Sequence, residues 1–456
     1  MEPRIALPDT IAAIATAPGR GGIGIVRISG PAARAISSAV TGKTPLPRVA
    51  TMSTFRSSDG TLIDSGITLF FPAPASFTGE DIVEFQCHGG PMVLDMIVEE
   101  VLSIGSRLAR PGEFSERAYL NGKLDLAQAE AIADLIDSAS REAARGAARS
   151  MSGEFSARVH ALEDQLTHLR ILVEAAIDFP EEDVDLIDDY NALARMSSLI
   201  DDIGAITDTA RSGRLLRDGI NVLIAGKPNA GKSSLLNALA GSSVAIVSSI
   251  PGTTRDLVRE RILLHGVPVH VTDTAGLRDS PDEIEREGIR RALLEAESTD
   301  VLVLVLDSTT EDEPGRVLQE HFGALSTPMP PVCVVLNKCD LSGIPPGRTN
   351  KTHKNTVAIS ALTGAGIDSL RGVLREIVGF SPSEGGTFTA RRRHLDGLSR
   401  ARSALESART NLNTKAGADL IAEDLRIAQR HLGDLTAPLS ADDLLGKIFS
   451  SFCIGK

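Results

Sequence analysis

The segment that most constrains the fold of this chain is a glycine-rich loop, Gly226-Lys-Pro-Asn-Ala-Gly231-Lys232-Ser233. A short apolar run at residues 222–225 precedes it, and residues 233–239 have the character of a helix. In such a strand, loop and helix, backbone N–H groups turn toward phosphates, the lysine supplies a positive charge, and the serine hydroxyl is placed for Mg2+ at the helix N-terminus. The sequence therefore predicts an α/β domain that binds a nucleoside triphosphate through Lys232 and Ser233.

Two downstream motifs identify the base. Asn337-Lys338-Cys339-Asp340 comes directly after the apolar residues 332–336. A carboxylate at Asp340 can accept hydrogen bonds from both N1–H and the 2-amino group of guanine, a pair of donors that adenine does not offer. Ser360-Ala361-Leu362 follows the strand-like residues 356–359, where a backbone N–H can support the base. We therefore expect guanine.

Two further motifs concern the γ-phosphate. Asp273-Thr-Ala-Gly276 ends the strand-like residues 267–272, which places a carboxylate near the Mg2+ shell, and the Thr253-Thr254 pair can complete the metal coordination with a hydroxyl. Four motifs in this order predict a Ras-like G domain that hydrolyses GTP. The expected GTP contacts are Asn229, Ala230, Gly231, Lys232, Ser233, Ser234, Ser248, Ser249, Ile250, Pro251, Gly252, Thr253, Thr254, Asp273, Thr274, Ala275, Gly276, Asn337, Lys338, Asp340, Ser360, Ala361 and Leu362.

The catalytic part of this G domain departs from a common pattern. Leu277 stands where many such enzymes carry a glutamine that orients the attacking water, and leucine cannot hydrogen-bond water. No arginine finger is identifiable, because Arg255 and Arg278 are equally well explained as solvated loop arginines. A monovalent cation held by Asn229 and by the loop at residues 248–253 is the alternative positive charge. The candidates for orienting the water are the carboxylates of Asp282, Glu283, Glu285 and Glu287.

Length, composition and charge limit the remaining possibilities. A chain of 456 residues predicts about three domains. The 4 cysteines form no CxxC pair, which favours a reducing compartment over a disulfide framework. No apolar run reaches the ~20 residues of a membrane span, and no signal or transit segment is recognisable, so we expect a cytoplasmic protein without membrane contact.

The net charge of −13 argues against a broad basic surface. The basic clusters are residues 391–394 and the stripe formed by Arg141, Arg145 and Arg149 on an expected helix. A solvated helix face and an RNA-contacting face explain that stripe equally well.

The spacing of apolar and turn-forming residues divides the chain into three regions and an insertion. Residues 1–119 contain strand-like runs at 23–28, 65–71 and 82–85, with Gly and Pro turns between them. Helical spacing follows, and two apolar stripes flank the G motifs. We expect an N-terminal α+β domain (1–119), a helical domain in two parts (120–215 and 381–456), and a Ras-like α/β domain (216–380) inserted into the helical one. The stripes are Leu162, Leu166, Leu169, Val173 and Ala176, and Leu395, Leu398, Leu405, Ala408 and Leu412.

Two short patterns are decoys. Gly19-Arg-Gly21-Gly-Ile-Gly24 fits a dinucleotide fingerprint, but β-branched residues follow it where that fold needs a helix. Cys453-Ile-Gly-Lys456 has the wrong last residues for prenylation. Its thiol is either a chance cysteine or a nucleophile or proton donor that reaches another domain's pocket.

Long motifs outside the G domain are similar to those of the MnmE (TrmE) family of tRNA-modification GTPases, over essentially the whole chain. They are Ala17-Pro-Gly-Arg-Gly-Gly-Ile-Gly24, Ser76-Phe-Thr-Gly-Glu-Asp81, Cys87-His-Gly-Gly-Pro91, Arg110-Pro-Gly-Glu-Phe-Ser-Glu-Arg-Ala118, Asn121-Gly-Lys-Leu-Asp-Leu-Ala-Gln-Ala-Glu130 and the terminal Cys-Ile-Gly-Lys. One departure is Cys87, where the family pattern has glycine. The resemblance implies an N-terminal domain for dimerisation and folate binding, a helical domain that carries Cys453, and an inserted G domain.

The resemblance also implies specific site residues. A tetrahydrofolate derivative (5-formyl or methylene) would contact Arg27, Glu84, Lys123 and Lys456. Potassium would lie at Asn229, Ser248, Ile250 and Thr253, and Mg2+ at Ser233 and Thr254. Glu285 would orient the attacking water, Lys232 would contact the phosphates, and Cys453 would be catalytic.

The implied reaction adds an aminomethyl-type group, often carboxymethylaminomethyl, at C5 of the wobble uridine (U34) of certain tRNAs. The one-carbon unit would come from methylene-tetrahydrofolate, and the partner MnmG would supply FAD to a homodimer of this chain, in a heterotetramer or larger complex. Two other functions share some of these motifs. A ribosome-assembly or RNA-binding GTPase predicts a basic appendix, and a folate-dependent transferase with a merely regulatory G domain predicts activity without MnmG.

Overall fold

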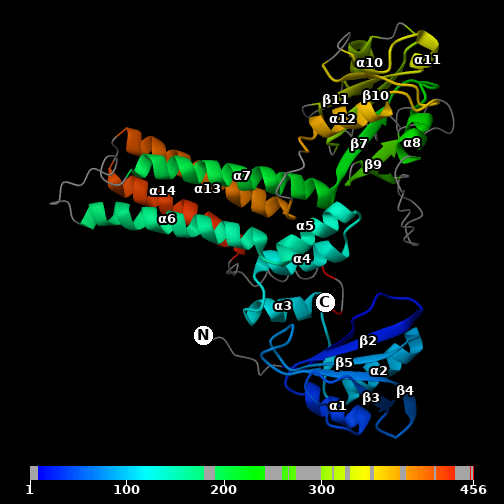
Figure 1. Cartoon of the computed structure of the whole chain (residues 1–456), viewed down its shortest axis with the longest axis vertical. Helices are drawn as coiled ribbons and strands as arrows, with labels where there is room; N and C mark the ends of the chain where they lie inside the picture. The colour runs from blue at the N-terminus through cyan, green and yellow to red at the C-terminus, as the bar shows by residue number, and fades with distance from the viewer. Residues whose placement is uncertain are drawn as a thin grey trace. The chain divides into compact units, whose positions relative to one another are not determined.

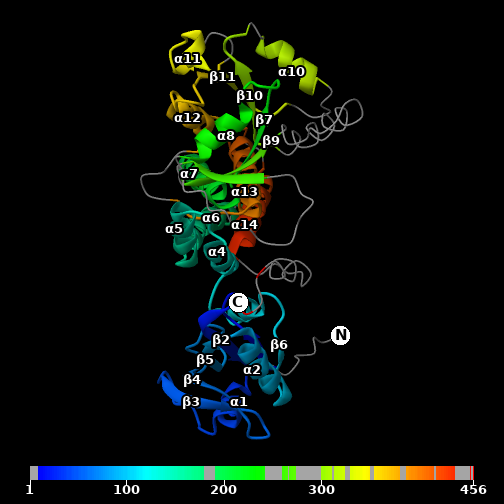
Figure 2. The same cartoon turned by 90° about the vertical axis from the view of Figure 1, so that its right-hand side faces the viewer.

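The structure is a computed structural model. It describes residues 9–178, 191–241, 259–264, 266–273, 299–310, 313–323, 329–349, 354–380, 387–414, 417–436, 452 and 455. The chain divides into two compact units, Met1–Ala133 with Leu432–Lys456, and Asp134–His431. Figure 1 and Figure 2 show the elements of both, and each unit is described by itself.

The first unit is built on a mixed six-stranded sheet with two helices on one face. Its strand order is β3-β4-β5-β2-β1-β6, and only the short pairing of β1 with β6 is parallel. Residues of α1 and α2 share one core with buried strand residues such as Val26, Phe55 and Phe85. The elements are β1 (Ile11–Ile14), β2 (Gly21–Ser29), α1 (Ala33–Thr41), β3 (Thr51–Arg56), β4 (Leu62–Phe71), β5 (Ile82–Gly89), α2 (Pro91–Ser103), β6 (Arg107–Leu108) and α3 (Glu113–Leu120).

The sheet face away from α1 and α2 carries polar side chains. Along β5, Val83, Phe85 and Cys87 are buried while Glu84, Gln86 and His88 are not. Because successive strand residues point to opposite faces, the second set lies on the open face together with Arg27 of β2, which pairs with Glu84 in the antiparallel register. This face therefore holds Arg27 and Glu84, and α3 covers another part of it, where Phe114 packs against Ile11 and Ala13 of β1. Residues 21–29 form β2, the strand that the sequence predicts where a dinucleotide fold needs a helix.

Long helices make up much of the second unit. α6, α7 and α13 pack along one another, and side-chain hydrogen bonds join α14 to α6 (Gln429 Nε2 to Thr167 Oγ1, 3.0 Å) and to α13 (Asn411 Nδ2 to Asp424, 2.8 Å). Both views show these four helices side by side (Figure 1, Figure 2). α4 and α14 each run across the boundary between the units. The elements are α4 (Leu126–Ile136), α5 (Arg141–Met151), α6 (Glu154–Asp178), α7 (Ala192–Asp218), α13 (Arg392–Asn413) and α14 (Ala418–Thr436).

The predicted apolar stripes form the interior of this bundle. Leu162, Leu166, Leu169 and Val173 are buried on α6, and Leu398, Leu405, Ala408 and Leu412 are buried on α13, while Ala176 and Leu395 are half-buried. On α5, Ser140 caps the N-terminus by accepting from the Ala143 N–H at 3.1 Å. The predicted arginine stripe of Arg141, Arg145 and Arg149 lies on the exposed face of that helix.

The inserted module is a seven-stranded sheet with both faces covered, in the order β12-β13-β11-β10-β7-β9-β8. Its central strands are parallel, so they are near-continuous apolar runs. α8 and α12 pack on one face and α10 on the other. The elements are β7 (Ile220–Ala225), α8 (Lys232–Ala240), β8 (Arg259–Leu264), β9 (Val267–Asp273), β10 (Val301–Asp307), α10 (Pro314–Phe322), β11 (Val332–Asn337), α11 (Cys339–Ser342), β12 (Gly347–Thr349), β13 (Thr356–Ala358) and α12 (Ile367–Ile377).

One carboxylate joins the two points where the chain enters and leaves this module. Asp134 Oδ1 accepts from Nε of Arg217, near the end of α7, at 2.8 Å, and from NH2 of Arg391, just before α13, at 2.9 Å. Arg391 and the buried His394 therefore turn inward, so only part of the basic cluster at residues 391–394 faces solvent. The helices α7 and α13 on either side of the insertion pack together, which confirms the predicted fold class.

Cys87, Cys333 and Cys339 are buried free thiols, and Cys453 lies outside the described residues. In the described part of the chain, no helix combines the length and apolarity needed to cross a membrane.

Candidate functional site

Two glycines of the P-loop occupy positions that no other residue could take. Gly226 has φ of 145°, and a Cβ there would lie 2.2 Å from the carbonyl oxygen of Val305 in β10. Gly231 has φ of 94°, and its Cβ would lie 2.1 Å from Nδ2 of Asn337. Both the backbone conformation and the contact distance exclude a side chain. The loop is therefore fixed against β10 and against the Asn-Lys-Cys-Asp motif.

Lys232 begins α8 and folds back over the loop. Its Nζ donates to the carbonyl oxygens of Gly226 at 2.8 Å and Lys227 at 3.0 Å, and the side chain is 7% exposed. The helix N-terminus beside it has no side-chain cap, so its first N–H groups can face a ligand. An ammonium ion and a helix N-terminus at one place form an anion site.

Asn337 connects three of the predicted motifs. Its Nδ2 donates to the carbonyl oxygen of Ala230 at 2.9 Å, and its Oδ1 accepts from the Ala361 N–H at 3.0 Å. The side chain is 3% exposed. Both polar atoms are thus engaged by backbone groups, and Asn337 links the P-loop to the Ser-Ala-Leu motif.

Lys338 is held by the end of the neighbouring strand. It adopts a left-handed backbone (φ 64°) and its Nζ bonds Asp307 Oδ2 at 2.5 Å. The bond from Lys338 and those from Thr309 lower the pKa of Asp307 to about 2. The ion pair therefore ties the end of the Lys338 side chain to the end of β10.

These elements enclose a cavity of about 620 Å3. That volume suits a nucleotide-sized ligand. Eleven of the expected GTP contacts line it, whereas Ala230 is buried behind it. Pro228 and Leu341 also line it and were not predicted, although each directly adjoins a predicted residue in the sequence. The lining residues are Pro228, Asn229, Gly231, Lys232, Ser233, Ser234, Asn337, Lys338, Asp340, Leu341, Ser360, Ala361 and Leu362.

Several predicted residues lie outside the described residues. For Asp273 only the backbone, at the end of β9, is described. The others are Ser248, Ser249, Ile250, Pro251, Gly252, Thr253, Thr254, Thr274, Ala275, Gly276, Glu285, Cys453 and Lys456, together with Leu277, Asp282, Glu283, Glu287, Arg255 and Arg278. Among the described residues, no group of three or more His, Cys, Asp or Glu side chains could hold a metal ion.

A second polar site lies in the first unit, on the open face of its sheet. Nε and NH2 of Arg27 bond the same oxygen of Glu84, Oε1, at 2.9 and 2.8 Å. Phe77 and Phe114 each place a ring 5.7 Å from the guanidinium carbon. Phe114 is fully buried, whereas Phe77 is partly exposed. Arg27, one of the residues predicted for folate binding, thus neighbours one buried and one partly exposed ring.

Lys123 comes close to this site through the loop at residues 76–81. Gly79 in this loop has φ of 80°, and a Cβ there would lie 3.1 Å from Cβ of Asn121 and 3.4 Å from Cγ of Lys123. Nδ2 of Asn121 donates to the carbonyl oxygen of Thr78 at 2.7 Å. The loop therefore lies against both Arg27, through Phe77, and Lys123.

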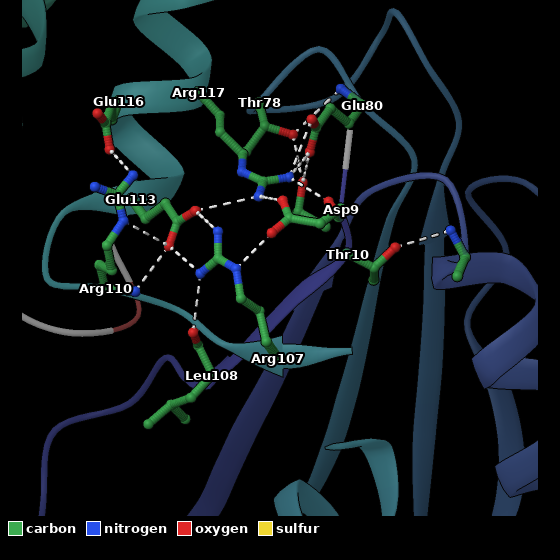
Figure 3. Close-up of polar contacts among 12 residues, drawn as sticks. Asp9, Thr10, Thr78, Glu80, Arg107, Leu108, Arg110, Glu113, Glu116 and Arg117 are labelled. Atoms are coloured by element: carbon green, nitrogen blue, oxygen red, sulfur yellow. Dashed lines mark hydrogen bonds and ion pairs between the residues drawn. The ribbon is translucent and has the colours of Figure 1, made fainter. Parts of the chain in front are cut away.

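A network of ion pairs supports the same loop. Figure 3 shows Arg107 and Arg117 pointing toward the carboxylate of Glu113, with Asp9 and Glu80 beside them. NH1 of Arg117 bonds Glu80 Oε2 at 3.0 Å, and NH2 bonds Glu113 Oε1 at 3.1 Å. NH1 of Arg107 bonds Glu113 Oε2 at 2.8 Å. Burial acts to raise the pKa of Glu113, but the bonds from Arg107, the Arg110 N–H and Arg117 lower it to about 2.

The C-terminal segment is anchored within the first unit at two points. Phe452 is buried against Tyr119, Leu126 and Ala129. Gly455 has φ of 93°, and a Cβ there would lie 2.2 Å from the carbonyl oxygen of Ile14. Both described residues of the terminal segment, next to Cys453 and Lys456 in the sequence, thus contact the unit that carries Arg27 and Glu84.

Comparison with known proteins identifies the family. The family described as "GTP-binding protein TrmE N-terminus" matches residues 10–123, and "MnmE helical domain" matches residues 126–453. The protein named "tRNA modification GTPase MnmE" of Marinobacter nauticus is 54% identical over 452 residues, 98% of this chain and 99% of that protein. This chain belongs to the MnmE family. The MnmE protein of Saccharophagus degradans is 51% identical over the same share of each chain.

A solved structure is similar over a smaller part. The G domain of the T. maritima FeoB iron transporter covers 35% of this chain and 98% of its own length, with 23% identity and a TM-score of 0.26. The two family models and the two MnmE relatives confirm, at the level of the family, the prediction from motifs outside the G domain, and these relatives are named tRNA modification GTPases. The individual site residues stay predictions.

Proposed function

We propose that this member of the MnmE family hydrolyses GTP and acts with MnmG to add a (carboxymethyl)aminomethyl group at C5 of the wobble uridine of certain tRNAs. The observation that carries the proposal is the cavity in which the P-loop meets the Asn-Lys-Cys-Asp and Ser-Ala-Leu motifs. It occurs in a chain that is 54% identical to a tRNA modification GTPase along nearly its whole length.

Asp340 is the group that would read guanine. It lines the cavity, whereas both polar atoms of the Asn337 side chain are engaged by Ala230 and Ala361. The two side chains of this motif therefore have different roles. Asn337 links the P-loop to the Ser-Ala-Leu motif, and the carboxylate of Asp340 accepts from N1–H and the 2-amino group of the base.

Lys232 and the start of α8 would hold the phosphates. Nζ of Lys232 donates to two loop carbonyl oxygens. Phosphate oxygens bound at the same place would accept hydrogen bonds from this ammonium group. Ser233 lines the same cavity and, with Thr254, would hold Mg2+, which neutralises charge on the phosphates when bound.

A monovalent cation would explain how this G domain works without an arginine finger. Asn229 lines the cavity from the left-handed region (φ 59°) and would hold K+ with Ser248, Ile250 and Thr253. Glu285 would orient the attacking water in place of the glutamine that Leu277 replaces. We infer that hydrolysis opens and closes paired G domains in a homodimer.

The one-carbon unit would bind in the first unit. A pterin offers a guanidine-like edge that suits the carboxylate of Glu84, and a glutamate tail that suits the cations Arg27, Lys123 and Lys456. The anchoring of Phe452 and Gly455 supports a C-terminal segment that delivers Lys456 to this unit. Cys453 would act there as nucleophile or proton donor toward the uridine, with FAD supplied by MnmG.

Nucleoside analysis of tRNA from cells that lack this protein tests the proposal. We expect C5 of the wobble uridine to be unmodified, to recover with the wild-type chain, and not to recover with Glu285→Ala or Cys453→Ser. Normal uridine modification together with accumulating ribosomal RNA precursors would refute the proposal in favour of an assembly factor.

A further inference from the structure

The aromatic ring of Phe77 is partly exposed to solvent. Among the large apolar side chains that the structure describes as exposed, it is the single aromatic one, at 36%. Phenyl rings normally bury most of their area, because each exposed Å2 forgoes about 25 cal/mol of transfer free energy. A partly exposed ring next to a candidate ligand site therefore calls for a partner.

The ring is placed on the charged pair of the site. Arg27 lies 5.7 Å from the Phe77 centroid, within cation–π range. The N–H groups that Arg27 directs to Glu84 both reach Oε1. Oε2 of Glu84 accepts no hydrogen bond from the described residues, so an acceptor and an aromatic ring both neighbour Arg27.

The loop that carries Phe77 is fixed by the residues that directly follow the ring. Oγ of the buried Ser29 lies 2.7 Å from Oγ1 of Thr78 and donates to Glu80 Oε2 at 2.8 Å. Arg117 bonds Glu80 as well, and both groups appear in Figure 3. Thr78 itself is fully buried. A ring presented by so constrained a loop loses little conformational freedom when a ligand arrives.

We propose that Phe77 contacts the bound folate by packing its ring against the pterin face, and that Glu80 and Arg117 act as positioning residues for this ring. The pterin edge would then reach Oε2 of Glu84, while Arg27 holds Oε1. The inference rests on the folate site proposed above. It means that the ring of Phe77 contributes to the preference of this site for a planar heterocycle.

Titration calorimetry of the full-length chain with (6S)-5-formyl-tetrahydrofolate tests the contact. Phe77→Leu keeps an apolar side chain without a ring, and we expect its Kd to rise roughly three- to tenfold, the range that stacked aromatic pairs contribute. Phe77→Tyr keeps the ring and is the matched control, with an expected Kd within twofold of wild type. An equal Kd for Phe77→Leu and wild type would overturn the role of Phe77.

A spectroscopic readout separates contact from mere stability. The chain contains 0 tryptophans, so Phe77→Trp introduces a single reporter whose emission responds to a ring that packs against it. We expect saturable quenching on addition of 5-formyl-tetrahydrofolate. Leu62→Trp, at an exposed position in β4, is the control and should be quenched far less. Equal quenching of the two reporters would contradict the contact.

The positioning role has its own test in the Phe77→Trp background. Glu80→Gln removes the charge that Arg117 holds, and we expect lower tryptophan anisotropy and a Kd raised at least threefold. Glu116→Gln removes a carboxylate from α3 that pairs only with Arg110 among the described residues, and should change neither. If Glu80→Gln behaves as Glu116→Gln does, the positioning role fails. Absence of binding by the wild-type chain would refute the folate site itself.

Discussion

Glu113 gives the sharpest prediction about stability in the first unit. Its side chain is 2% exposed and bonds Arg107 and Arg117. The pKa is lowered from 4.5 to about 2. At about 1.36 kcal/mol per pKa unit, this shift corresponds to roughly 3 kcal/mol of stability at neutral pH. Because the folded pKa is depressed, that contribution is present above pH 4.5 and is lost as the pH falls toward 2. We therefore expect Glu113→Gln to lower the free energy of unfolding of this unit by about 3 kcal/mol at pH 7.

The assay uses the absence of tryptophan in the chain. A Leu108→Trp reporter, at an exposed position beside Arg107, follows urea unfolding of this unit without signal from the other one. Glu116→Gln is the matched control on the same helix, since burial raises the pKa of Glu116 despite Arg110 and its charge contributes nothing favourable at pH 7. The reasoning would be refuted if the two variants shifted the unfolding midpoint equally, or if the deficit of Glu113→Gln were unchanged between pH 7 and pH 3.

Three further outcomes follow from the sites. Asp340→Asn should shift nucleotide preference from guanine toward xanthine, and competition binding with GTP and XTP would show unchanged selectivity if Asp340 does not read the base. Replacing KCl by NaCl at equal ionic strength should lower GTP turnover at least tenfold, and equal rates would remove Asn229 from a cation role and return Arg255 and Arg278 to consideration. Gly455→Ala should place a Cβ about 2.2 Å from the carbonyl oxygen of Ile14, and hydrogen exchange of residues 452–456 would report undocking. Unaltered exchange in that variant would mean that the terminal segment does not depend on this contact.

The sequence predicts those parts of the structure that depend on local order. The P-loop follows a strand and precedes a helix, the base motifs end β11 and β13, and the apolar stripes of α6 and α13 are buried, as expected. Each of these rests on the period of a single element or on a motif with a fixed position in its fold. For residues 1–119 the sequence predicts an α+β domain, but it does not place the helices α1 and α2, because the patterns there are those of strands and turns.

Contacts between residues that are far apart in the sequence cannot be predicted from such local patterns. Arg27 and Glu84 were expected to share a ligand, but the contacts of Arg27 with Phe77 and Phe114 depend on how β2, α3 and the loop at residues 76–81 meet. Asn337 was expected at the base, and the structure shows its amide engaged by two backbone groups more than 20 residues away in sequence. Single-sequence patterns carry no information about partners at such separations.

The junction at Asp134 bears on how motion can pass between the helices and the inserted module. Arg217 and Arg391, at the two crossings of the chain, bond the same carboxylate oxygen. Because both arginines bond one oxygen atom, a rotation of the module about Asp134 can keep both bonds. A movement that separates Arg217 from Arg391 would break at least one of these charge-assisted bonds. We therefore expect nucleotide-driven changes in the module to rotate it relative to the helices more than to pull it away from them. Asp134→Asn should weaken this coupling while leaving nucleotide affinity unchanged.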